Sequence, residues 1–156
     1  MHKAILAAVA ALGLSAAASA QKSPETWVYA GMQGGAMGWE ATAIKRDHAA
    51  DTASTLRFVY FTKPREGVKG DFTWVFQDIE FHCSENTFRL MNAAFYDKGR
   101  GGGEAESASP EMPVQANTPE SVLKQVLCDN AVLSGARRAS NMADAMDGAE
   151  LAALPG

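Results

Sequence analysis

Three residues near the middle of the chain have side chains that could bind a metal ion. Asp78, Glu80 and His82 alternate along the run DFTWVFQDIEFHC, so on a regular strand they line one face. Carboxylates and an imidazole can bind a divalent ion. Neighbouring members of this set would lie about 6.7 Å apart, which is a long spacing for three ligands of one ion. We therefore interpret them as the solvated face of a half-buried sheet, with a metal site as the alternative.

The two cysteines are the other residues with chemistry of their own. Cys83 lies in the strand-like stretch FHCSENTFRL, and Cys128 ends the helix-like stretch PESVLKQVLC. Such a pair can form a structural disulfide, stay reduced in the core or act in redox chemistry. The redox interpretation is the least favoured, because no C-x-x-C spacing is present. The choice between the other two depends on the compartment of the protein.

The N-terminus predicts export. Residues 1–20 begin with a basic region, continue with an uncharged apolar run and end with small residues before Gln21, as in a cleaved secretory signal peptide. The apolar run is too short for a comfortable membrane span, so we expect cleavage and no stable membrane insertion. Disulfides persist in exported proteins, and we therefore favour a disulfide between Cys83 and Cys128.

Charge and motifs argue against several function classes. The expected mature chain keeps 136 of the 156 residues, with 13 basic and 18 acidic ones and a net charge of −5, because cleavage removes Lys3. This balance predicts no binding of nucleic acid. The run GMQGGAMG lacks the Lys-Ser/Thr pair of a phosphate loop, and no G-x-S-x-G motif is present. His48 fits a solvated turn, so we expect no enzyme activity and no cofactor.

Strand signals extend from about Trp27 to Asn117. The run TLRFVYFT is rich in β-branched and aromatic residues, and KPREGVKG reads as a hairpin connection to the next strand. In that next strand the apolar residues change parity between Phe76 and Ile79. A one-residue bulge near Gln77 and Asp78 would return both sets to one face, and a strand buried on both faces is the alternative. We favour the bulge.

One helix is predicted over residues 119–129. Thr118 can cap it, and Pro119 and Glu120 suit its first turn. An apolar stripe follows at helical spacing and includes Val122, Leu123, Val126 and Leu127. Packing this stripe on the sheet would bring Cys128 to Cys83.

Residues 130–156 are rich in alanine, with few large apolar groups. Asn141 could cap a helix through Leu151, with Met142, Ala145, Met146 and Ala149 on one face, and we expect a weakly docked, weakly helical tail or a disordered one. One helix covers only one face of a sheet. Apolar surface around Val59 and Phe61 is therefore left for a homodimer contact, unless the tail covers it.

Four features together resemble a known family. They are an early Trp27, the aromatic-x-Cys unit at 81–83, the TFRL strand after it and a Pro-started helix ending in Cys128. Over about residues 26–129 this arrangement resembles the surface-adhesin protein E-like domains of Gram-negative bacteria. The resemblance implies an antiparallel sheet with one helix, tied by the Cys83–Cys128 bridge. Some members are self-associating surface proteins that bind host matrix components.

The sequence thus predicts an α+β fold. We expect a signal peptide at 1–20, a domain at 21–129 and a tail at 130–156. The domain should have an antiparallel sheet of about five to six strands, with one helix packed on one face and tied to it by a disulfide. The expected function is that of an exported, non-enzymatic binding or adhesion domain with a protein partner, in the periplasm or at the cell surface. The alternatives are a periplasmic structural or housekeeping interaction protein and a metal-binding protein that uses Asp78, Glu80 and His82.

Overall fold

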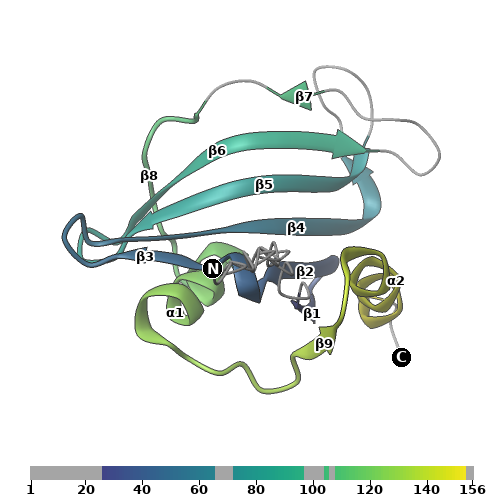
Figure 1. The fold of residues 1–156 in the computed structure, drawn as a ribbon. Coiled ribbons are helices and arrows are strands. Elements are labelled where there is room, and N and C mark those ends of the chain that lie inside the picture. The colour runs from purple at the N-terminus through teal and green to yellow at the C-terminus, as the bar shows by residue number, and fades with distance from the viewer. Residues whose placement is uncertain (1–25, 66–71, 97–103, 106–107, 154–156) are drawn as a thin grey trace, which may run out of the picture.

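A computed structural model describes residues 26–65, 72–96, 104–105 and 108–153. The predicted signal peptide, residues 1–20, lies outside the described residues. The described chain forms one antiparallel sheet with two α-helices (Figure 1). Its strands are β1 (Trp27–Met32), β2 (Gly35–Glu40), β3 (Lys45–Asp47), β4 (Thr52–Arg65), β5 (Phe72–His82), β6 (Thr87–Tyr96), β7 (Glu104–Ala105), β8 (Met112–Pro113) and β9 (Arg137–Ala139). Its helices are α1 (Pro119–Asp129), α2 (Met142–Ala153) and the 3-10 turn η1 (Ala41–Ala43).

The strand order in the sheet is β7-β6-β5-β4-β2-β1-β9, with β3 paired to β4 and β8 paired to β6. The prediction of about five to six strands was therefore too low for the described part of the chain, which has nine. The five strands of six residues or more are those that the sequence pattern shows. The other four have two or three residues each, and such short segments carry no readable alternation of apolar residues.

Strand β5 is buried on both faces, so the predicted bulge near Gln77 is wrong. Its pairing with β4 is regular from His82 opposite Thr52 to Trp74 opposite Tyr60. The register shift lies in β6 instead, where Asp78 pairs with Asn92 and the next residue, Ile79, pairs with Leu90. The alternative interpretation is confirmed, because each parity of β5 belongs to a different core cluster.

The first core cluster lies under α1. Leu123 and Leu127 on the helix are fully buried, and so are Ile79 and Phe81 on the sheet. The start of α1 has the predicted cap: Ser121 N donates to Thr118 Oγ1 at 3.2 Å. The predicted packing of this helix on one face of the sheet is therefore confirmed.

A buried arginine links the sheet to the first turn of α1. Arg57 is only 3 % exposed, and its Nη1 lies 2.8 Å from Glu120 Oε1. Its Nε and Nη2 both donate to Gln77 Oε1, at 3.1 and 2.8 Å. Burial lowers the pKa of the Arg57 guanidinium, and the charge of Glu120 opposes this shift. A buried cation needs such partners, because leaving it alone in the core would be strongly destabilising.

The second core cluster lies on the opposite face under α2. Trp27, Tyr29, Phe58 and Trp74 supply its large side chains. The helix contributes small ones, and Ala145 and Ala149 are fully buried.

A single packed helix was predicted, so the packing of α2 on the sheet corrects that prediction, whereas the helix expected after Asn141 in the tail is present. The part of the tail described here, residues 130–153, forms β9 beside β1 and then α2. Asn141 caps α2 by accepting a hydrogen bond from the Asp144 N–H at 2.9 Å. The expectation of a weakly helical or disordered tail missed this packing, because alanines give little hydrophobic signal. Figure 1 places α1 toward the end of the sheet near β3 and β8, and α2 toward the other end.

Candidate functional site

A shallow groove crosses β4, β5 and β6 on the face that α2 partly covers. Its volume is about 460 Å³, and neither helix contributes to its lining. Its polar lining residues are Glu40, Lys45, Ser54, Thr55, Asp78, Glu80 and Asn92, and its apolar ones are Ala43, Leu56, Ile79 and Met91. The groove is therefore a part of the sheet with a mixed polar and apolar lining that the two helices leave open.

Hydrogen bonds between β5 and β6 organise the acidic side chains of this groove. Asn92 Nδ2 donates to Asp78 Oδ2 at 2.9 Å. Arg89 donates to Glu80 Oε1 through both Nε and Nη2, at 2.9 and 2.6 Å. Cross-strand pairs of this kind hold a strand pair in register and fix the direction of their polar atoms. The groove thus presents a fixed set of hydrogen-bonding groups.

The three candidate metal ligands of the sequence analysis lie along one strand but do not form one cluster. Asp78 and Glu80 are engaged with β6. His82 ends β5, and its Nε2 lies 3.8 Å from Glu80 Oε1. Its Nδ1 lies 3.7 and 3.5 Å from carboxylate oxygens of Glu85 and Glu111. Sequence reasoning missed both of these glutamates. Glu85 could have been noticed three residues after His82 in the predicted turn, whereas Glu111 reaches the site only through the pairing of β8.

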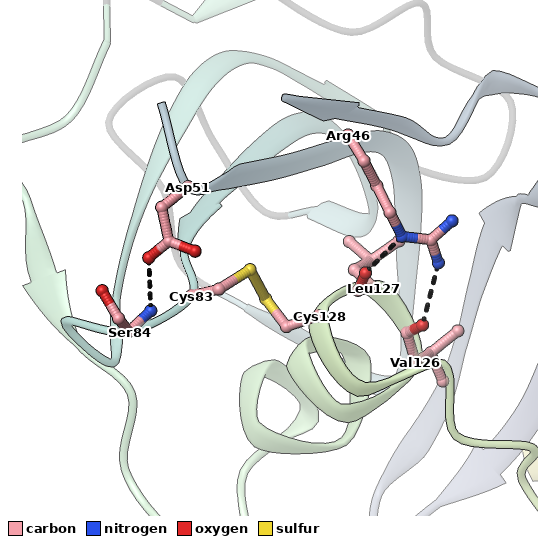
Figure 2. The surroundings of a disulfide bond; sticks show 7 residues. All are labelled: Arg46, Asp51, Cys83, Ser84, Val126, Leu127 and Cys128. Atoms are coloured by element: carbon pink, nitrogen blue, oxygen red, sulfur yellow. Dashed lines mark hydrogen bonds between the residues drawn. A yellow bond between two sulfur atoms is a disulfide. The ribbon is translucent and has the colours of Figure 1, made fainter. Parts of the chain in front are cut away.

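The predicted disulfide is confirmed. Cys83 and Cys128 are bonded, with their Cα atoms 5.6 Å apart. The bond ties the end of β5 to the last turn of α1 (Figure 2). No free cysteine occurs in the described chain, and both cysteines of the sequence are in this bond.

Polar contacts fix both sides of the disulfide (Figure 2). On the helix side, Arg46 Nε donates to the Leu127 carbonyl at 2.7 Å, which satisfies one of the free acceptors at the end of α1. On the strand side, Ser84 N donates to Asp51 Oδ2 at 2.8 Å. These hydrogen bonds with Ser84 lower the pKa of the Asp51 carboxyl. The disulfide and these hydrogen bonds hold the end of α1 against the sheet.

The partner surface proposed from Val59 and Phe61 needs correction. Val59 is 6 % exposed within the single chain, and its face is the one that carries α1. Phe61 is half-buried and belongs to a row of aromatic rings with Phe72 and Phe95. The ring centroids lie 6.1 Å apart for Phe61 and Phe72, and 4.9 Å apart for Phe72 and Phe95. Of the two predicted residues, only Phe61 has a side chain that reaches the surface.

The fold and the disulfide define a class of small antiparallel-sheet domains in which a helix is bonded to the sheet. The sequence model of the surface-adhesin protein E family matches residues 27–129, which include β1 to β8 and α1 with its bridge. The chain belongs to this family, as its resemblance predicted. The match ends before β9 and α2.

Solved structures of Haemophilus influenzae protein E are similar to this chain. One is 16 % identical with a TM-score of 0.46 and covers 63 % of this chain and 82 % of that chain. Another, from a non-typeable strain, is 15 % identical with a TM-score of 0.46 and covers 65 % and 76 %. No match was found among the curated proteins that were compared. Among the described helices, none has the length and apolar character needed to cross a membrane.

Proposed function

We propose that this chain is an exported, non-enzymatic binding domain of a Gram-negative cell envelope that recognises a protein partner. The observation that carries the proposal is its membership of the surface-adhesin protein E family. The disulfide agrees with it, because such a bond persists in an oxidising compartment. The mature protein would begin after residue 20.

The groove on β4, β5 and β6 is the proposed contact surface for that partner. It is open, lined by both polar and apolar groups, and neither helix contributes to its lining. The Asp78–Asn92 and Glu80–Arg89 pairs hold these groups in place before binding. Groups fixed in advance lose less conformational entropy when a partner binds, which supports recognition at this surface.

Pull-down from envelope extract with the mature chain tests this surface. A variant with Asp78→Ala and Asn92→Ala should lose a partner that the unchanged chain retains. Asp147→Asn on the exposed face of α2 is the control and should retain it. Equal retention by all three proteins would contradict a role of the groove, and failure of the unchanged chain to retain any partner would contradict a partner within the cell envelope.

The location of the protein separates a surface adhesin from a periplasmic interaction protein. Protease added to intact cells should degrade a surface protein. A periplasmic structural or housekeeping protein should resist until the outer membrane is made permeable. We propose the surface location, since the family is one of surface adhesins. Protection in intact cells would move the function to the periplasmic alternative.

A weak homodimer is also part of the proposal. The half-buried rings of Phe61, Phe72 and Phe95 form an aromatic row on the α1 face of the sheet. Burying exposed aromatic surface of this kind between two chains favours their association. Sedimentation of the mature chain should show concentration-dependent dimerisation that Phe61→Ser weakens. A strict monomer near millimolar concentration would refute it.

A further inference from the structure

One end of the sheet brings together three side chains that can bind a metal ion. His82 is the last residue of β5, Glu85 lies in the turn to β6, and Glu111 precedes β8. Strand β8 pairs with the start of β6, with Thr87 opposite Pro113, which places Glu111 beside the turn. Residues far apart in the sequence therefore meet through the pairing of a two-residue strand.

The spacing of these three side chains fits ligands around an ion. His82 Nδ1 lies 3.7 Å from Glu85 Oε2 and 3.5 Å from Glu111 Oε1. One ligand atom from each residue can be chosen so that all lie within 4.8 Å of one another. A charge-assisted N–H···O bond would be shorter, about 2.7–2.9 Å. Ligands at about 2.0–2.1 Å from a tetrahedral zinc ion are separated by about 3.3 Å, which is close to the two distances from His82. The separation of up to 4.8 Å within the set would have to shorten when an ion binds.

A second layer of contacts supports the same interpretation independently of the acidic charge. His82 Nε2, the ring nitrogen remote from the cluster, faces Glu80 Oε1 at 3.8 Å, and Arg89 holds that carboxylate. Thr87 Oγ1 donates a hydrogen bond to Glu111. Metal-binding histidines commonly have a carboxylate behind their second nitrogen, and metal-binding carboxylates are commonly hydrogen-bonded in turn. The hydrogen bond to Glu111 is present here, whereas Glu80 lies beside His82 Nε2 beyond hydrogen-bond distance.

The charges at this site suit a divalent cation. Arg89 pairs with Glu80, whereas in the described part of the chain no lysine or arginine forms an ion pair with Glu85 or Glu111. Two carboxylates and a neutral imidazole carry a charge of −2. The nitrogen ligand favours a zinc-type ion over calcium or magnesium, which prefer oxygen ligands. The three side chains are 30, 66 and 43 % exposed, so an ion can reach them from solvent.

We propose that His82, Glu85 and Glu111 form a binding site for a zinc-type divalent ion. Three protein ligands leave one position of a tetrahedral ion for water. The ion would tie the segment before β8 to the β5–β6 turn. The neighbouring Cys83 already ties the same end of the sheet to α1. The two links would then fasten two different segments to one hairpin.

Calorimetry with the mature, untagged chain tests this site. The protein is first stripped with a chelator and then titrated with zinc chloride, with calcium and magnesium chlorides as comparison. We expect one zinc per chain, little binding of the other two ions and a melting temperature that rises with zinc concentration. Glu111→Gln, Glu85→Gln and His82→Gln should each weaken zinc binding by about 10-fold or more.

Two matched substitutions and one measurement of folding make the result decisive. His48→Gln changes an exposed histidine and Asp147→Asn changes an exposed carboxylate, both away from the proposed site. Both substitutions should leave zinc affinity unchanged. Circular dichroism and an intact disulfide show that each variant is folded, and Glu85→Gln, at the most exposed ligand, is the substitution least able to disturb the fold. Absence of stoichiometric zinc binding by the unchanged chain would overturn the proposal. Unchanged affinity in folded Glu85→Gln and Glu111→Gln would do the same.

Discussion

The two helices pack on the sheet by different means. Helix α1 inserts large side chains, Leu123 and Leu127, and is bonded to β5 by the disulfide. Helix α2 presents Ala145, Ala149 and Gly148, and the sheet below it provides the bulk. A Cβ at Gly148 would lie 2.2 Å from the Tyr29 hydroxyl oxygen, so the close approach needs a glycine there.

The hydrogen bonding of buried polar groups also differs between the two regions. Beneath α1 the buried Arg57 has hydrogen-bond partners in Glu120 and Gln77. Beneath α2 the buried Trp27 Nε1 has no hydrogen-bond partner in the described chain. An unsatisfied buried donor costs about 1–3 kcal/mol. The comparison teaches that α1 is fixed by large side chains, charge and a covalent bond, whereas α2 brings small residues close to the aromatic side chains of the sheet.

The largest effect should come from removing a ring at the centre of each cluster. Phe81→Ala and Phe58→Ala should each lower the free energy of unfolding by about 3–5 kcal/mol, because both rings are fully buried and leave a cavity. Urea denaturation measures this loss. Hydrogen exchange then separates the regions: α1 amides should lose more protection in Phe81→Ala, and α2 amides in Phe58→Ala. A loss below about 0.5 kcal/mol, as for a surface site, would contradict the packing at that ring.

Loss of the disulfide should come next and affect α1 alone. Cys83→Ser and Cys128→Ser should each cost about 4 kcal/mol, the loop entropy that the chain model gives for a bridge across 45 positions. Chemical denaturation of each variant and of the oxidised parent measures it. Mass spectrometry of exported parent protein without reductant should find no free thiol. Equal loss of protection in α1 and α2 would argue against the difference between the regions.

A smaller effect is expected at Gly148, the glycine with which α2 approaches the sheet. In a helix, alanine is favoured over glycine by about 1 kcal/mol. At Gly148 the added methyl group would also approach the Tyr29 ring carbon Cζ to 2.4 Å, so we expect a net loss of about 1–2 kcal/mol. Ala143→Gly, at an exposed position of the same helix, is the matched control for propensity and should cost about 1 kcal/mol. A more stable Gly148→Ala protein would disprove the close approach.

Features with a strong local signal were predicted from the sequence. The long strands alternate, the start of α1 carries Thr118 and Pro119, and the two cysteines lie in segments that must pack together. For α2, the cap at Asn141 and the face with Ala145 and Ala149 were predicted, but the firm packing of the helix on the sheet was not. Its buried residues are alanines, which resemble those of an exposed helix, and the aromatic rings that cover them come from strands more than 60 residues earlier.

Features that depend on register were missed. The burial of β5 on both faces follows from its regular pairing with β4. The bulge was predicted in β5 but lies in β6, because a sequence shows which residues of a strand share a face and not how the strand pairs with its neighbours. For the same reason, the residues that lie near His82 could not all be predicted from the sequence of its own strand. Glu111 lies 29 positions away and reaches it through β8, whose two residues have no pattern of their own.

The smallest expected effect concerns Asp51 at the disulfide end of the sheet. Its backbone has φ of 55°, a left-handed conformation that asparagine also tolerates, so Asp51→Asn keeps the turn. Hydrogen bonds with Ser84 lower the pKa of the Asp51 carboxyl from 3.8. In the unfolded chain this carboxyl therefore binds a proton at higher pH than in the folded protein. Its contribution to stability is present above pH 3.8 and disappears as the pH falls through the lower folded-state pKa.

Unfolding of the parent and Asp51→Asn proteins at pH 6 and at pH 2.5 measures this contribution. The parent should be slightly more stable at pH 6, and the difference between the two proteins should shrink at pH 2.5. Asp147→Asn on α2 is the exposed control. The difference in unfolding free energy between this variant and the parent should not shrink between pH 6 and pH 2.5. A difference for Asp51→Asn that stays constant with pH would show that the carboxylate charge does not hold the turn. The polar contacts at the junction would then be dispensable beside the covalent bond, and α1 would rest on packing and the disulfide alone.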